Sequence, residues 1–157
     1  MKPILRFALM AAIGLAVVSV AAAQDSWVGK TIIIKKHEIK ITARTAFIPE
    51  QSDVNGGRYV FAYTITIHNL GPVPAQLISP HWIITDSNHQ VQEVRGKGVV
   101  GEQPLLRPNE SFEYTSGTAI ATPVGTMRGS YQMKTRDGEE FDAPIPEFTL
   151  SMPRVLH

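Results

Sequence analysis

The clearest structural signal in the chain is Arg58-Tyr59-Val60-Phe61-Ala62-Tyr63-Thr64-Ile65-Thr66-Ile67-His68-Asn69. The odd-numbered positions from 59 to 67 are all aromatic or isoleucine, and the positions between them hold smaller side chains, valine, alanine or threonine. Successive side chains of a β-strand point to opposite faces, so one face of this segment would be strongly apolar. A period of two with β-branched and aromatic residues predicts a half-buried strand.

The same period recurs on both sides of that segment. The further strand candidates are residues 38–47, 76–85, 90–95, 111–116, 127–135 and 139–152. Turn residues separate them at Asn55-Gly56-Gly57, Gly71-Pro72, Asp86-Ser87-Asn88, Pro108-Asn109 and Arg136-Asp137-Gly138. Short strands at regular spacing, without helical periodicity, predict an all-β fold in which two antiparallel sheets pack face to face as a sandwich.

Two features locate the last strands more closely. Asp137-Gly138 tolerates the positive φ angles of a tight turn, so residues 127–145 should form a hairpin. Pro144 and Pro146 interrupt the final strand, and proline cannot donate to a central ladder. We therefore expect this strand to lie partly at a sheet edge, where the strand of another chain could add.

A glycine-rich run, Gly96-Lys97-Gly98-Val99-Val100-Gly101-Glu102-Gln103-Pro104, spells G-x-G-x-x-G. The dinucleotide-binding form of this motif opens a helix, but Pro104 and Pro108 disfavour a helix here. Two interpretations remain. Backbone amides of the run could form a nest for an anion or contact a partner, with Lys97 adding charge. The glycines could instead satisfy turn geometry in a structural loop. The candidate binding residues are Gly96, Lys97, Gly98, Gly101, Glu102 and Gln103.

A possible metal site lies around a predicted turn. His81, Asp86 and His89 fall within nine residues, and imidazole and carboxylate groups are common metal ligands. Alternation along the strand, however, places Asp86 on the face opposite His81. The turn would have to bring the Asp86 side chain back to the His81 face for the three groups to share a metal ion. The other interpretation packs Trp82 in the core and satisfies His81 by hydrogen bonds.

The N-terminus has the layout of a secretory signal peptide. Lys2 and Arg6 precede an uncharged apolar run over residues 7–20, and three alanines end at Ala23. The alternative is a retained membrane anchor, but residues 7–23 are at the short limit for a bilayer span. We expect cleavage near Ala23, a single domain over residues 24–157, a periplasmic or secreted location, and no stable membrane span after cleavage.

Composition excludes several classes of function. The chain has no cysteine, so disulfides and thiolate nucleophiles are impossible. Of its 15 basic residues, 13 remain after loss of Lys2 and Arg6, against 14 acidic residues, which gives no reason to expect nucleic acid. The sequence holds no H-E-x-x-H and no G-x-S-x-G motif. We therefore expect neither an enzyme nor a bound cofactor.

Several segments together carry a family resemblance. They are residues 59–67, His81-Trp82-Ile83-Ile84-Thr85-Asp86, residues 93–105 with the glycine run, Ser111-Phe112-Glu113-Tyr114-Thr115-Ser116-Gly117, Gly129-Ser130-Tyr131-Gln132-Met133 and Pro153-Arg154-Val155-Leu156-His157. Over residues 31–157 the chain resembles the ApaG family, also called CorD. The resemblance implies a fibronectin type III-like sandwich of uncertain biochemical activity, linked in bacteria to cobalt resistance and magnesium efflux. A signal peptide departs from the usual family pattern.

Similar domains in eukaryotic F-box proteins and in a DNA-polymerase-interacting protein are regarded as interaction modules. By that resemblance the chain is expected to be a non-catalytic protein-interaction module with an unidentified protein partner, linked indirectly to metal efflux. The alternative is a small-ligand binder that takes an anion at the glycine run or a divalent metal at His81, Asp86 and His89. The sequence does not indicate the oligomeric state.

Overall fold

We describe the protein from a computed structural model, which covers residues 35–154. The predicted signal peptide of residues 1–23, with its cleavage position, lies outside the described residues. Within residues 35–154, no helix is long and apolar enough to cross a membrane.

The described chain consists almost entirely of strands. They are β1 (Ile39–Phe47), β2 (Tyr59–Asn69), β3 (Ala75–Asp86), β4 (Val91–Arg95), β5 (Leu105–Leu106), β6 (Ser111–Ile120), β7 (Val124–Thr135) and β8 (Glu140–Ser151), with one short 3-10 turn, η1 (Pro49–Gln51). All seven strand candidates from the sequence are present, and β6 and β7 extend beyond their expected ends. Alternation missed only β5, because a strand of two residues has no period to detect.

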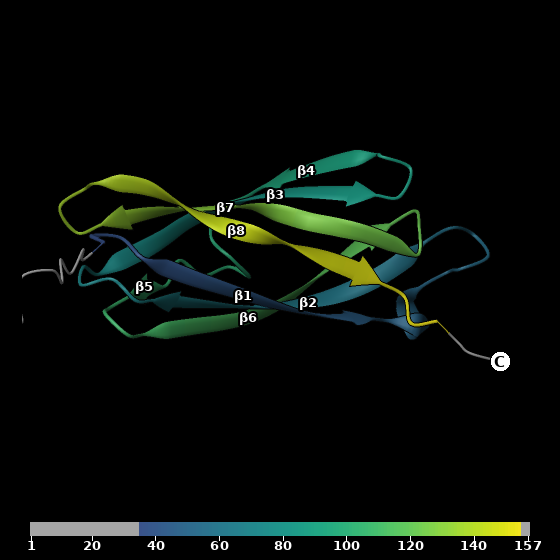
Figure 1. The fold of residues 1–157 in the computed structure, drawn as a ribbon, viewed down its shortest axis with the longest axis horizontal. Helices are drawn as coiled ribbons and strands as arrows, with labels where there is room; N and C mark the ends of the chain where they lie inside the picture. Colours follow the sequence, from purple (N-terminus) through teal and green to yellow (C-terminus); the bar gives the residue numbers. More distant parts are fainter. Residues whose placement is uncertain (1–34, 155–157) are drawn as a thin grey trace, which may run out of the picture. The chain divides into compact units, whose positions relative to one another are not determined.

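The strands form two antiparallel sheets that face each other (Figure 1). One has the order β1-β2-β6, and the other has the order β4-β3-β7-β8 with β5 added beside β3. The predicted all-β sandwich is therefore confirmed. The expected hairpin is also present, as β7 and β8 pair antiparallel and Gly138 has a φ of 90° in the turn between them. The strand with both prolines, β8, ends its sheet, as predicted.

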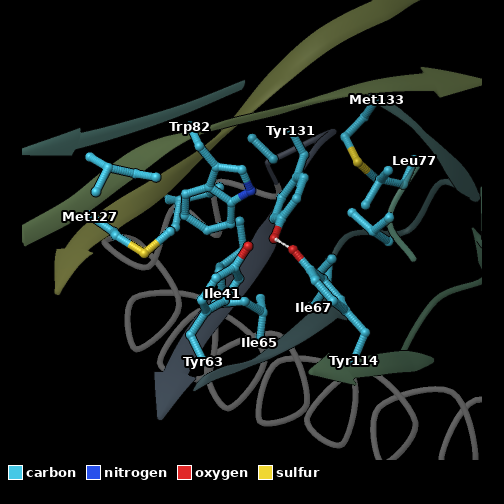
Figure 2. Packing of buried hydrophobic residues seen from close by; sticks show 14 of the residues in the cluster. Ile41, Tyr63, Ile65, Ile67, Leu77, Trp82, Tyr114, Met127, Tyr131 and Met133 are labelled. Carbon is cyan, nitrogen blue, oxygen red and sulfur yellow. Dashed lines mark hydrogen bonds between the residues drawn. The ribbon is translucent and has the colours of Figure 1, made fainter. Parts of the chain in front are cut away.

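The core lies between the two sheets and contains the face that the alternation predicted. Phe61, Ile65 and Ile67 of β2 are fully buried, and Trp82 of β3 is only 4% exposed. Figure 2 shows Trp82 above Tyr63 and beside Tyr131, and it meets both rings edge-on. These aromatic contacts join the two sheets at the centre of the sandwich.

A polar contact crosses this apolar core. The hydroxyls of Tyr114 on β6 and Tyr131 on β7 are 2.5 Å apart, and one donates to the other (Figure 2). Burial raises the pKa of both phenols well above the ordinary value. Both tyrosines therefore stay neutral and hydrogen-bonded, since a buried hydroxyl without a partner is costly.

The two long sides of the sandwich differ. On one side, which we call the closed edge, β1 runs against β8, and the Thr45 hydroxyl donates to the Thr149 carbonyl. On the other side, which we call the open edge, β4 ends one sheet and β6 ends the other. A hollow of about 150 Å³ separates them there, lined by Ile84, Asp86, Gln90, Val91, Gln92, Ala119, Ile120 and Ala121.

Candidate functional site

The glycine run follows β4 and forms a miniature hairpin. The Val99 and Glu102 main chains exchange hydrogen bonds of 2.8 and 2.9 Å, with Val100 and Gly101 as the two residues of the turn. Their φ angles are 45° and 82°, and both are positive, as a type I′ turn requires. The G-x-G-x-x-G spacing therefore serves a β-turn in this chain.

The loop is tied to an irregularity in β3. The pairing of β3 with β7 shifts register between Leu77 and Ser79, which leaves the Ile78 carbonyl free of the ladder. This carbonyl accepts from the Gly98 amide and from the Gln103 side-chain amide, both at 2.8 Å. Gly98 has a φ of 65°, and an added Cβ would lie 2.3 Å from the Glu102 carbonyl oxygen. Glycine is therefore required at position 98.

These bonds bear directly on the predicted anion nest. The amides of Gly98, Val99 and Glu102 already donate to main-chain carbonyls, so they cannot also point at a bound anion. No helix begins within residues 96–104 to add a favourable dipole. Lys97 is exposed on the same loop. The geometry favours the structural-loop interpretation for the glycines.

Val100 stands out at the tip of the loop. Its side chain is 58% exposed, although its backbone lies in the left-handed region that β-branched residues rarely adopt. Such strain persists only where the surrounding structure enforces it, and it concentrates at functional positions. The ties from Gly98 and Gln103 to β3 supply that enforcement.

A polar hollow of about 360 Å³ lies beside the start of the loop, on the outer face of the β4-β3-β7-β8 sheet. It is lined by Ser79, Pro80, His81, Arg95, Gly96, Ser130, Gln132 and Asp142. His81 Nε2 lies 3.1 Å from Glu93 Oε2, and Arg95 Nη2 lies 4.0 Å from the same oxygen. The arrangement offers a cation and several hydrogen-bonding groups to a small polar molecule.

The structure does not bring the three predicted metal ligands together. His81 lies mid-strand beside Glu93, whereas Asp86 ends β3 five positions later, roughly 16 Å along an extended strand. The Asp86 carboxylate accepts from the Asn88 and Gln90 amides and so fixes the turn. His89 has a φ of 62° within that turn. Within residues 35–154, no group of three or more histidine, aspartate or glutamate side chains is placed to hold a metal.

His81 and Trp82 instead match the other interpretation of that segment, with Trp82 buried and His81 hydrogen-bonded. Sequence reasoning did not connect His81 with the residues that surround it. Glu93, Ser130 and Asp142 come from three other strands. Alternation could assign each of them to an outer face, but only the register between strands brings them to the same place.

Comparison with known proteins places the chain in a family. The model of the ApaG domain matches residues 49–135. Protein ApaG of Thiobacillus denitrificans is 68% identical over 123 residues, which is 78% of this chain and 97% of the relative. Protein ApaG of Nitrosospira multiformis is 65% identical over the same length and the same shares. The crystal structure of an ApaA protein from Bordetella pertussis is 54% identical and superposes with a TM-score of 0.74, covering 78% of this chain and all of that one. The chain therefore belongs to the ApaG domain family.

Proposed function

We propose that this domain is a non-catalytic protein-interaction module that presents the 96–104 loop to a protein partner. One observation carries the proposal. Val100 is an apolar side chain held out into solvent on a strained backbone, at the tip of a loop that hydrogen bonds tie to β3. The type I′ turn accounts for the positive φ at position 100, but it does not call for an exposed β-branched side chain there, because glycine and asparagine adopt this conformation at lower cost.

An apolar tip on a loop that is tied to the sheet suits recognition by a partner. Binding energy concentrates in a few anchor side chains that fill pockets on the other protein. Fixing a loop in its bound conformation before contact lowers the entropic cost of association. An effect on cobalt or magnesium transport, as expected from the family resemblance, would then be exerted through the partner.

The test exploits the strain at Val100. Asparagine tolerates positive φ, so Val100→Asn should leave the thermal midpoint unchanged or raise it. The same variant removes the apolar anchor, and we expect it to lose the partner that the unmodified chain captures from a cell extract. Val54→Asn is the matched control, because Val54 is also exposed, at 46%, on a different loop.

The pattern of capture decides the proposal. A protein retained by the unmodified chain and by Val54→Asn, but absent from Val100→Asn, supports it. Equal capture by all three chains, or specific capture by none, contradicts it.

The polar hollow beside His81 favours a second candidate, the binding of a small polar molecule. Arg95 would supply the charge for an anion, and Gln132 and Ser130 would supply hydrogen bonds. A thermal-shift screen against phosphate, nucleotides, cobalt and magnesium tests it, since a ligand at about 100-fold its dissociation constant adds about 2.7 kcal/mol. A shift that disappears in Arg95→Gln would support this candidate over the first.

The signal-peptide layout of residues 1–23 bears on the compartment. We propose that the domain works outside the cytoplasm and that its partner is an exported protein. N-terminal sequencing of the protein from its native host checks this, with Gln24 expected as the first residue. Recovery of a chain that still begins at Met1 would contradict it.

A further inference from the structure

Strand β4 lies at an edge of its sheet. Among the strands of residues 35–154 it pairs only with β3, and all five of its residues are exposed. Val91 is 61% exposed and Val94 is 40% exposed. Natural edge strands are protected from further pairing by short length, charged side chains, a proline, a bulge or a covering loop. Strand β4 is short and has two charges, Glu93 and Arg95, but they are of opposite sign and so complement a second copy of the same strand. The sequence Val91-Gln92-Glu93-Val94-Arg95 contains no proline and no register shift against β3.

The pairing with β3 defines which backbone groups are free. The Asp86 amide donates to the Gln90 carbonyl at the start of the hairpin. Hydrogen-bonded pairs recur every second residue in an antiparallel ladder, so Gln92 and Val94 direct their backbone groups toward β3. Val91, Glu93 and Arg95 direct theirs outward, where a further strand could bond them.

The same register defines the side-chain faces. Glu93 contacts His81 on the outer face of the sheet, and Arg95 lies directly across from His81 on that face. Val94 lies across from the buried Trp82, so it points to the inner side, toward the open edge. A partner strand would meet two opposite charges outside and an apolar side chain inside.

We propose that β4 pairs antiparallel with β4 of a second copy of this chain, about a twofold axis at Val94, to form one continuous sheet across the dimer. In this register Glu93 of each copy lies across from Arg95 of the other, and the two Val94 side chains meet. Opposite charges across a strand pair stabilise it, whereas like charges destabilise it. An axis at Glu93 would place two glutamates together, so charge selects the register.

Gly96 gives independent support. It has no positive φ, and a Cβ added to it would meet no atom of residues 35–154 within 4 Å. The described part of the chain therefore has no steric need for glycine at this position. In the paired register, Gly96 lies across from Gln92 of the second copy, where a residue without a side chain leaves room for the glutamine.

Charge reversal tests the register directly. Self-association of the purified chain is measured by sedimentation from about 1 µM to about 1 mM. Glu93→Arg alone and Arg95→Glu alone each place like charges across the interface, so each should weaken the dimer about tenfold or more. An equimolar mixture of these two variants restores both charge pairs in a mixed dimer, so the mixture should form dimers as the unmodified chain does. Added salt should weaken the mixed dimer.

Lys134→Glu is the control, since Lys134 belongs to an ion pair with Glu140 on β7 and β8 of the same sheet, away from the open edge. It should leave the dimer unchanged. A chain that stays monomeric throughout the concentration range overturns the proposal. So does a dimer that survives both single reversals, or one that the mixture fails to restore. The result does not depend on whether a partner binds Val100.

Discussion

The closed and open edges differ in how they treat the backbone groups that an edge strand leaves without a partner. At the closed edge, β1 and β8 contact each other, and Pro144 and Pro146 remove two N–H groups from β8. At the open edge, β4 and β6 leave a hollow between them, and β4 keeps every N–H group. The closed edge is protected within one chain. The open edge has the chemistry of a surface that another strand can complete.

The largest expected difference between the edges is in packing. Ile145 of β8 is 4% exposed and belongs to the core, whereas Val94 of β4 is 40% exposed. Ile145→Ala should lower the free energy of unfolding by about 2–5 kcal/mol, because it removes buried surface and leaves a cavity. Val94→Ala should change it by about 0.5 kcal/mol or less in the monomer. Urea denaturation at low protein concentration measures both, and similar losses would show that the edges do not differ.

The next effect concerns the bond that holds β6 to the opposite sheet. Tyr114→Phe leaves the buried Tyr131 hydroxyl without its partner, which should cost about 1–3 kcal/mol. Replacing both tyrosines by phenylalanine should cost less than the sum of the two single changes, since no orphaned hydroxyl remains. Denaturation of the three variants forms a double-mutant cycle, and strict additivity would mean that the bond contributes nothing.

The same pair predicts a response to alkaline pH. Both phenols have a raised pKa in the fold, so their contribution is complete below the ordinary tyrosine value of about 10. It should decline as the pH rises above that value, because the unfolded chain then releases protons that the folded chain retains. The midpoint of denaturation should fall faster with pH in the unmodified chain than in the double phenylalanine variant.

A smaller effect distinguishes two glycines of the loop beside the open edge. Gly98→Ala forces a side chain into the left-handed region, at roughly 1–2 kcal/mol from the backbone alone, and against the Glu102 carbonyl. Gly96→Ala meets open space and should be nearly neutral in the monomer. Hydrogen exchange should report the loss at the Gly98 amide, which donates to Ile78. If both changes lowered the stability equally, the need for glycine at position 98 would be disproved.

The features that could be predicted from the sequence are those that neighbouring residues determine. Alternation assigned Phe61, Ile65 and Ile67 to the core, and local chemistry located the Asp137-Gly138 turn and the edge character of β8. Each of these follows from a few neighbouring residues. Local sequence also favoured a structural loop at the glycine run, since Pro104 and Pro108 disfavour a helix.

The features that could not be predicted depend on how strands far apart in the sequence are placed against each other. The free carbonyl of Ile78, which holds the loop, exists only because β3 and β7 shift against each other. The metal hypothesis depended on the short spacing of His81 and His89, but an extended strand carries such residues apart. Nor does the sequence state that β1 meets β8, which decides that β4 remains open.

The smallest prediction concerns the end of the closed edge nearest the start of β1. Glu139 forms an ion pair with Lys36 and lies 3.1 Å from His37 Nε2, and His37 stacks on Phe141 of β8. Hydrogen bonds from Lys36 and His37 hold the pKa of the Glu139 carboxyl below its usual range. The stability that this carboxyl contributes is therefore present above the ordinary glutamate pKa and lost as the pH falls through the lowered value.

Glu139→Gln should consequently lower the thermal midpoint slightly at neutral pH and not at all in acid, where the unmodified carboxyl is protonated too. Glu147→Gln is the matched control, since Glu147 is exposed on β8 and has no ion pair with another described residue. A difference between the two variants that persists in acid would mean that the charge on Glu139 is not what position 139 contributes to this end of the closed edge.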